Sequence, residues 1–249
     1  MLQETIINKQ LKTKHLGRQL VLHDTLPSTN DLAKTISPTA AHGTTIAASE
    51  QTAGRGRRGR QFFSPALCGL YISVIIKQDL TPRALGLLTG AVAVAAAKGI
   101  EKVCPADVRI KWVNDLLING KKVGGILCEK TQDGAVIGIG INLSTPAFPA
   151  ELAEIASSLL LACGKAPDDN AVLAAVLNEL EPLLNDLESA AFLRESRARS
   201  AVLGKTVTVL RGEERFSAKA IDIDENGYLV VQTDREIIAL FSGEVSLRL

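Results

Sequence analysis

The sequence predicts an α/β or α+β sheet domain that is followed by a small C-terminal β-barrel. Three observations carry this prediction. Strand-like runs lie on both sides of one long Ala/Leu/Val-rich helical segment that begins at Pro82. About 45 residues at the C-terminus form short alternating runs without a helical period. The length of 249 residues fits one large domain with a small appendage.

The composition excludes several classes of protein. Hydrophobic residues make up 46% of the chain, charged residues 22%, and the formal net charge is +1. These values exclude a disordered polyelectrolyte and a globally basic nucleic-acid binder. The three histidines and four cysteines lack metal-ligand spacing, so no metal site built from protein ligands is predicted. The cysteines are expected to be free thiols: Cys68, Cys104, Cys128 and Cys163.

No targeting or membrane signal stands out. The N-terminus lacks an apolar core of signal-peptide length. The most apolar stretch, Ala84 to Ala97, is shorter than the roughly 20 residues of a membrane helix. We therefore expect a cytoplasmic protein.

The first hundred residues alternate between strand and helix signals. Residues 1–20 have room for at most one short helix or strand. Ser28 is the expected N-cap of a helix that carries apolar residues as far as Ile36. Pro82 at a first-turn position opens a long helix to about Ile100. The strands predicted here are 20–22, 44–48 and 70–76.

The remainder separates into two parts. Strands 108–112, 116–118, 123–129 and 135–142 surround an Asn119-Gly120 hairpin turn, and helices are predicted over 151–163 and 168–199. After Gly204 come strands 205–210, 216–223, 228–232 and 235–241. We therefore predict a domain of residues 1–201 and a β domain of residues 202–249.

One loop concentrates positive charge: Gly54-Arg55-Gly56-Arg57-Arg58-Gly59-Arg60. Glycines let successive backbone N–H groups turn toward one anion, and arginines add forked donors for phosphate or carboxylate. With no apolar side chain to anchor it, the loop is expected to be mobile until it orders over a negative ligand. The alternative is a flexible Arg/Gly tract that contacts RNA nonspecifically.

Other polar clusters each allow two interpretations. Lys111-Trp112-Val113-Asn114-Asp115 is either a strand followed by an Asx turn, or a lysine for phosphate with two oxygen donors for a magnesium-bound nucleotide. Lys121 and Lys122 precede Gly124-Gly125, which would allow a close approach to the backbone. Ser28-Thr29-Asn30 either caps a helix or binds a small polar ring. Asn142 either ends a strand in a turn or faces a ligand.

Together and in this order, these segments resemble the biotin protein ligase family. The resemblance covers roughly residues 17–249. The segments that carry it are Ser28-Thr29-Asn30, Glu50 to Arg60, Phe63-Ser64-Pro65, Leu70 to Ser73, Lys111 to Asp115, Lys122 to Leu127 and Gly138 to Leu143. It implies the α+β class, with a central mixed sheet flanked by helices of the class II aminoacyl-tRNA synthetase/biotin ligase type and a small SH3-like C-terminal β-barrel.

Two departures from the family pattern bear on the site and the function. Val113 stands where the family usually has proline, so this turn is expected to be less rigid. The segment ahead of the catalytic region is too short for the N-terminal helix-turn-helix of some bacterial members. We therefore expect the monofunctional type, an enzyme without a repressor module.

The resemblance implies a two-step reaction. Biotin and ATP give biotinyl-5′-AMP and pyrophosphate, and a lysine of a biotin carboxyl carrier protein then attacks the mixed anhydride. Because a carboxylate attacking a phosphate brings two anions together, several fixed cations and Mg²⁺ are expected. The carrier would belong to acetyl-CoA carboxylase or a related carboxylase. The resemblance allows a homodimer and implies no DNA or membrane partner.

The resemblance also implies site residues. The catalytic set is Arg57, Lys111, Asp115 and Lys122. The set that binds biotin and ATP is Ser28, Thr29, Asn30, Gln51, Gly54, Arg55, Gly56, Arg57, Arg58, Lys111, Asn114, Lys122, Gly124, Gly125 and Asn142.

Within these sets the implied roles differ. Lys122 would hold the biotin carboxylate, while Ser28-Thr29-Asn30 and Gln51 would recognise its ureido ring. Arg55 to Arg57 would form a lid that retains the adenylate. Asn114 and Asp115 would serve the nucleotide and magnesium, and Trp112 would pack the fold or flank adenine.

Two other functions remain as alternatives. One is an acyl transferase of the lipoate–protein ligase type, which shares the fold and the acyl-adenylate logic. The other is a nucleic-acid binder that uses the Arg/Gly loop, which would bind in a salt-sensitive manner without ATP.

Overall fold

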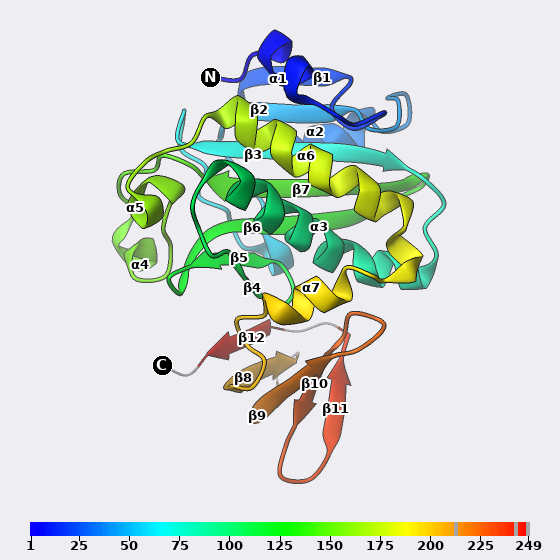
Figure 1. The fold of residues 1–249 in the computed structure, drawn as a ribbon, viewed down its shortest axis with the longest axis vertical. Helices are drawn as coiled ribbons and strands as arrows, with labels where there is room; N and C mark the ends of the chain where they lie inside the picture. Colours follow the sequence, from blue (N-terminus) through cyan, green and yellow to red (C-terminus); the bar gives the residue numbers. More distant parts are fainter. Residues whose placement is uncertain (212–213, 242–243, 248–249) are drawn as a thin grey trace.

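The computed structural model describes residues 1–211, 214–241 and 244–247 (Figure 1). Its larger part is a seven-stranded mixed sheet in the order β1-β2-β3-β7-β6-β5-β4. Strands β1 and β2 pair in parallel, and the other neighbours pair antiparallel. The strands are β1 (Leu20–Leu26), β2 (Thr45–Gln51), β3 (Gly69–Lys77), β4 (Arg109–Lys111), β5 (Asp115–Ile118), β6 (Lys121–Thr131) and β7 (Gly134–Asn142).

Helices cover both faces of this sheet. Side chains of successive strand residues point to opposite faces, so Ile75 of β3 packs with α2 on one face while Val74 and Ile76 belong to the cluster of α3 on the other. The helices are α1 (Glu4–Gln10), α2 (Thr29–Ile36), α3 (Pro82–Val103), α4 (Ala150–Ala153), α5 (Leu159–Cys163), α6 (Asp169–Asn185) and α7 (Leu193–Ala198), with short 3₁₀ turns at Arg57–Gly59 and Leu187–Ser189.

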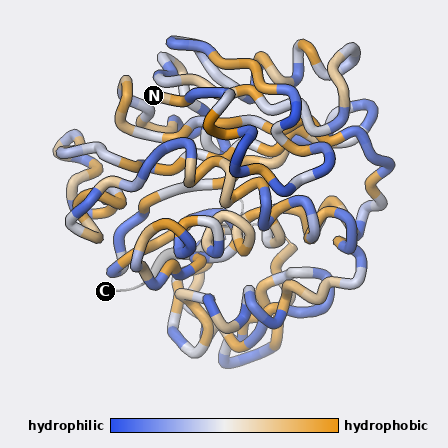
Figure 2. The backbone as a smooth tube through the Cα atoms, turned by 45° about the horizontal axis from the view of Figure 1, so that its top comes forward, coloured by the Kyte–Doolittle hydropathy of each residue, from blue (hydrophilic) through white to orange (hydrophobic). Residues whose placement is uncertain are grey.

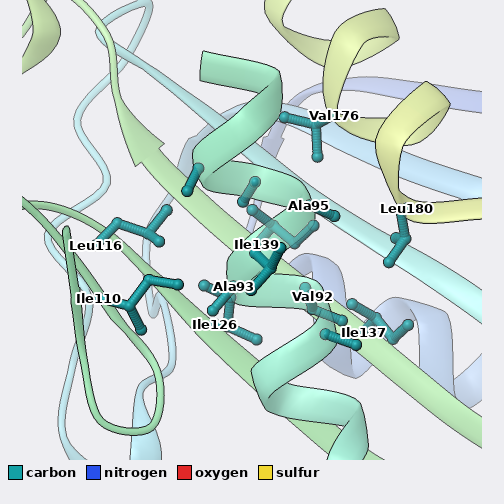
Figure 3. Packing of buried hydrophobic residues seen from close by; sticks show 14 of the residues in the cluster. Val92, Ala93, Ala95, Ile110, Leu116, Ile126, Ile137, Ile139, Val176 and Leu180 are labelled. Carbon is teal, nitrogen blue, oxygen red and sulfur yellow. The ribbon is translucent and has the colours of Figure 1, made fainter. Parts of the chain in front are cut away.

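The main core lies between the sheet and the α3–α6 pair. Figure 3 shows Val92, Ala93 and Ala95 of α3 among strand side chains such as Ile137 and Ile139. Small residues let the two helices approach closely, and a Cβ added at Gly99 would lie 2.7 Å from the Cα of Val176.

Helix α3 is long and apolar enough to cross a membrane by length and composition. However, 67% of its most apolar window is buried inside the protein, as expected for a core helix. The helix is also longer than the sequence predicts, since it continues from Ile100 to Val103.

The smaller part is a five-stranded antiparallel sheet in the order β11-β10-β9-β8-β12. Its strands are β8 (Thr206–Arg211), β9 (Glu214–Ile223), β10 (Leu229–Gln232), β11 (Ile237–Leu240) and β12 (Glu244–Leu247). Figure 2 shows hydrophobic stretches in both parts of the molecule, and the buried apolar cluster around α3 extends to Val207 and Leu229. The predicted α+β class with an SH3-like C-terminal domain is confirmed.

Three element predictions were wrong in detail. The helix predicted over 168–199 ends at Asn185, and α7 begins only at Leu193. The backbone leaves the helical region at Asp186, with φ −126° and ψ 31°, and Ala190, at φ 55°, lies in the left-handed region before α7. The helix predicted over 151–163 is two short helices, the second capped by the Ser158 side chain. Strand β12 was not predicted at all.

Candidate active site

Most of the predicted site residues line one cavity of about 990 Å³, counted with its opening to solvent. Its walls come from segments far apart in the sequence: the start of α2, the Arg/Gly loop, the β4–β5 turn, and strands β3, β6 and β7. The predicted site residues that line it are Ser28, Thr29, Asn30, Gln51, Arg55, Gly56, Arg57, Arg58, Lys111, Asn114, Asp115, Lys122 and Gly125.

The lining is strongly cationic. Six cationic side chains and one carboxylate face the cavity: Arg55, Arg57, Arg58, Arg60, Lys111 and Lys122, against Asp115. Such an excess of positive charge favours an anionic ligand and stabilises negative charge that builds up during a reaction. The near-neutral charge of the whole chain conceals this local excess.

One end of the cavity is a buried network of amides and hydroxyls at the start of α2. Ser28 caps this helix, with its Oγ accepting from the Asp31 N–H at 3.4 Å. The Gln51 carbonyl oxygen accepts from the backbone N–H of Thr29 at 2.9 Å and from its hydroxyl at 3.1 Å. These uncharged groups suit a polar, uncharged ring, so capping and ligand binding are compatible roles for this segment.

Asn30 is the most constrained member of this network. Its Nδ2 donates to Leu127 O at 3.2 Å and to Glu129 Oε2 at 2.9 Å, and Ser73 Oγ lies 2.5 Å from its Oδ1. Gly138 leaves room for the amide, because a Cβ there would lie 2.3 Å from Oδ1. Three strands therefore hold one carboxamide in a single orientation.

The Arg/Gly loop has polar anchors at its base. The Gly56 N–H donates to Arg60 O at 2.7 Å, and Arg55 bridges to Gln61 as in an antiparallel strand pair. Arg55 Nη1 also lies 2.5 Å from Asp31 Oδ1. Burial opposes ionisation of Asp31, but hydrogen bonds from Lys34 and Arg55 outweigh it and lower the Asp31 pKa. Anchoring by salt bridges was not foreseen, and mobility of the loop stays a prediction.

Farther along the cavity, the Arg/Gly loop meets the β4–β5 turn. Arg57 Nη1 donates to Asn114 Oδ1 at 3.3 Å, and Asn114 Nδ2 donates to Ile126 O at 3.2 Å. The Asn114 side chain therefore links the loop to β6. Arg58, at φ 56°, is in the left-handed region.

Lys122 and Lys111 approach the cavity from β6 and β4, the two strands on either side of β5. Lys122 Nζ pairs with Asp115 Oδ1 at 2.6 Å and lies 5.8 Å from the centre of the Phe62 ring. Lys111 has no ion-pair partner in the described part of the chain, so its charge is available to a ligand. Lys121 differs from Lys122 because its Nζ donates to Ala153 O, outside the cavity lining.

Trp112 connects the cavity to the C-terminal domain. It lines the cavity, is 6% exposed, and donates from Nε1 to Gly227 O at 3.0 Å in the β9–β10 turn. The peptide between Trp112 and Val113 is cis. Of the two roles predicted for Trp112, packing within the fold is therefore the one that these contacts support.

Three predicted site residues lie outside the cavity lining. At Gly54 a Cβ would meet Phe62 O at 2.5 Å, and at Gly124 it would meet Gly140 O at 2.8 Å, so both glycines allow close backbone packing. Asn142 is buried, and its Nδ2 donates to Ser157 O at 3.0 Å. None of these three residues contributes to the lining of the cavity.

Several residues of the site were not predicted from the sequence. Phe62 packs across β6 and β7, where a Cβ at Gly140 would lie 2.7 Å from its ring. Tyr71 lies edge-on to it at 6.3 Å, and burial raises the pKa of this phenol. The Gly125 and Gly140 pair was the available signal, because two facing glycines leave space that a neighbouring ring can fill.

The side chains fit a nucleoside triphosphate better than a metal bound by the protein alone. No group of three or more His, Cys, Asp or Glu side chains suited to a metal occurs among the described residues. Mg²⁺ is commonly held by one or two carboxylates together with substrate phosphates. Asp115 and Asn114 are the oxygen donors that could complete such a site.

This fold and this site define a chain of the Biotin/lipoate A/B protein ligase family, whose model matches residues 22–145. The model of the Biotin protein ligase C terminal domain matches residues 202–248. Within that family, the chain belongs to the biotin protein ligases.

Curated relatives and solved structures support this assignment. The chain is 36% identical to the Bifunctional ligase/repressor BirA of Bacillus subtilis, over 99% of this chain and 79% of that protein. It is 34% identical to the Biotin--[acetyl-CoA-carboxylase] ligase of Mycobacterium tuberculosis, over 92% and 88%. The biotin protein ligase from Aquifex aeolicus in complex with biotin and ATP matches with a TM-score of 0.82 and 30% identity, over 93% and 99%. The resemblance deduced from the motifs is confirmed.

Proposed function

We propose that this chain activates biotin with ATP to form biotinyl-5′-AMP and transfers the biotinyl group to a lysine of a carboxylase carrier protein. The observation that carries this proposal is the composition of the cavity wall. A buried, uncharged hydrogen-bonding network lies at one end, and six cations lie beside it. Biotin combines an uncharged ureido ring with a carboxylate that must meet a triphosphate, so it matches both parts.

In the first step, an oxygen of the biotin carboxylate attacks the α-phosphorus of ATP, and pyrophosphate leaves with the bonding electron pair. Lys122, which pairs with Asp115, would hold the carboxylate after exchanging that partner for the ligand. Lys111 and the loop arginines Arg57 and Arg58 would stabilise charge on the phosphates. Mg²⁺, when bound with ATP, neutralises part of the triphosphate charge.

In the second step, the amine of the carrier lysine attacks the acyl carbon, AMP leaves, and the amine gives up a proton. Asp115 is the one carboxylate of the cavity lining, so it is the side chain proposed to receive that proton. The Arg/Gly loop would cover the adenylate until the lysine arrives, because water would otherwise hydrolyse the mixed anhydride.

The protein partner is proposed to dock beside this opening. Acetyl-CoA-carboxylase ligases among the relatives imply a carboxylase carrier as the acceptor. The seven-stranded sheet ends in β1 and β4, and such edge strands can pair with an extended segment of a partner. A homodimer joined through the sheet stays a prediction that sedimentation velocity would test.

The decisive experiment incubates the purified protein with ATP, Mg²⁺ and biotin, and measures pyrophosphate release and labelling of a carrier domain. We expect both to depend on biotin. Lipoic acid in place of biotin tests the alternative within the family, and activity with lipoic acid alone would overturn the proposal. Absence of biotin-dependent pyrophosphate would also overturn it.

The lid role has its own test. Arg57→Gly should release the adenylate and increase labelling of lysines on unrelated proteins, because one contact between the loop and Asn114 is lost. A variant that retains the intermediate as well as the parent enzyme would contradict the lid role.

A further inference from the structure

Glu129, near the end of β6, contacts both the ring-binding network and the base of the Arg/Gly loop. Its Oε2 accepts from Asn30 Nδ2 at 2.9 Å. Its Oε1 pairs with Lys34 Nζ at 2.9 Å and lies 3.4 Å from Arg55 Nη1. The side chain is 22% exposed and does not line the cavity.

The partners of Asn30 determine which way its amide faces. A carboxamide has one donor end and one acceptor end, and the main-chain oxygen of Leu127 and the carboxylate of Glu129 are acceptors only. Both N–H bonds of Nδ2 are therefore used on that side. The oxygen Oδ1 accepts from Ser73 Oγ, with the two oxygens 2.5 Å apart, which uses one of its two lone pairs. Oδ1 is also the atom of the amide nearest to a Cβ built at Gly138, which lines the cavity together with Asn30.

An amide fixed in this way offers an acceptor to the cavity and withholds its donors. Asn30 is 4% exposed, so its groups cannot exchange partners with bulk water. An acceptor fixed before binding favours a ligand that brings a ring N–H to the second lone pair of Oδ1, whereas a ring without a donor leaves that lone pair unused beside Ser73.

We infer that Glu129 is a positioning residue that selects ring ligands carrying N–H donors, by fixing the Asn30 amide with its oxygen toward the cavity. This inference rests on the proposed function and deepens it. The ureido ring of biotin has two N–H groups, and the dithiolane ring of lipoic acid has none. Glu129 would therefore contribute to discrimination between the two acids of the family.

The carboxylate has a second role that must be separated from the first. With Asp31, it forms a cluster of two carboxylates and two cations that holds Arg55 and Lys34. Glu129→Gln removes the charge but keeps an oxygen for Asn30. Glu129→Met removes both with little change in size. Asp31→Asn is the matched control, because it weakens the pairing of Arg55 and leaves Glu129 beside Asn30.

The test measures the dissociation constants of biotin and lipoic acid by calorimetry for the parent and the three variants, after circular dichroism has verified their folding. In E129M we expect the preference for biotin over lipoic acid to fall about tenfold, the effect of one charge-assisted hydrogen bond. E129Q and D31N should keep the parent preference within about twofold, since each keeps an acceptor beside Asn30.

Three results would overturn the inference: a parent-like preference in E129M, an equal loss in E129Q, or an equal loss in D31N. If E129M does not fold, Glu129→Thr replaces it, because the shorter hydroxyl cannot reach Asn30. Failure of the proposed function is distinguishable, because the parent itself would then bind no biotin.

Discussion

Gly138 provides the sharpest test of how the ring end of the cavity is built. A Cβ added there would lie 2.3 Å from Oδ1 and 2.9 Å from Cγ of Asn30. The amide would have to move by about 1.1 Å to reach the 3.4 Å of ordinary contact. Because strands β3 and β6 hold that amide, such a movement breaks its hydrogen bonds to Leu127 and Glu129.

The expected cost of Gly138→Ala follows from these contacts. Two hydrogen bonds are worth about 1 kcal/mol each, and the gain from replacing glycine in the unfolded chain offsets about 0.4–1 kcal/mol. We expect the free energy of unfolding to fall by about 1–2 kcal/mol. The dissociation constant for biotin should rise about tenfold, because the displaced Asn30 no longer meets the ring.

Urea denaturation followed by circular dichroism measures the first quantity, and calorimetry measures the second. Gly86→Ala is the matched control, because its nearest neighbours would lie 3.7 Å from the new Cβ and the helix tolerates alanine. That variant should be at least as stable as the parent and bind biotin equally well. If G138A also keeps the parent stability and affinity, Asn30 is not held as described.

Three further changes have definite expected outcomes. Lys122→Met should lower biotin-dependent pyrophosphate release by about 10²-fold, because the cation beside the carboxylate is lost; a loss under threefold in the same assay would contradict that role. Trp112→Phe removes the hydrogen-bond donor to Gly227 O. The free energy of unfolding measured by urea denaturation should fall by about 1–3 kcal/mol, because the Gly227 carbonyl loses its donor and the smaller ring leaves a cavity. Unchanged stability would argue against this link between the domains. At Glu181, burial raises the pKa, but three backbone N–H groups from Lys14, His15 and Leu16 outweigh it and lower the pKa. Its contribution is present above the unfolded-state pKa and lost as pH falls through the folded value, so Glu181→Gln should cost about 1–3 kcal/mol at pH 7 and progressively less below about pH 4.5. Urea denaturation at pH 7 and at a pH below about 4.5 checks this. An equal difference in the free energy of unfolding between parent and variant at the two pH values would contradict it.

The four cysteines were expected to be free, unreactive thiols. All four cysteines are free in the structure. Burial raises the pKa of the Cys128 thiol to about 12 and, with the neighbouring Cys163, also that of Cys104. Thiols that stay protonated at neutral pH are poor nucleophiles, which agrees with the predicted inert role of these two.

Local sequence by itself determined which residues could form an anion site. We could recognise the Arg/Gly loop, Lys111 and Lys122, because their chemistry depends on residue type and on near neighbours in the chain. The Ser28 cap, the start of α3 at Pro82 and the Asn119-Gly120 turn were recognisable for the same reason.

Only the tertiary structure decided how these groups are oriented and paired. Arg55 pairs with Asp31 and Glu129, Asn142 binds Ser157, and Trp112 reaches Gly227, 115 residues away. Such contacts depend on the register of β6 against β7 and on the docking of α2 and the C-terminal domain. No short segment encodes them, because each requires backbone groups that become neighbours only after the whole sheet has assembled.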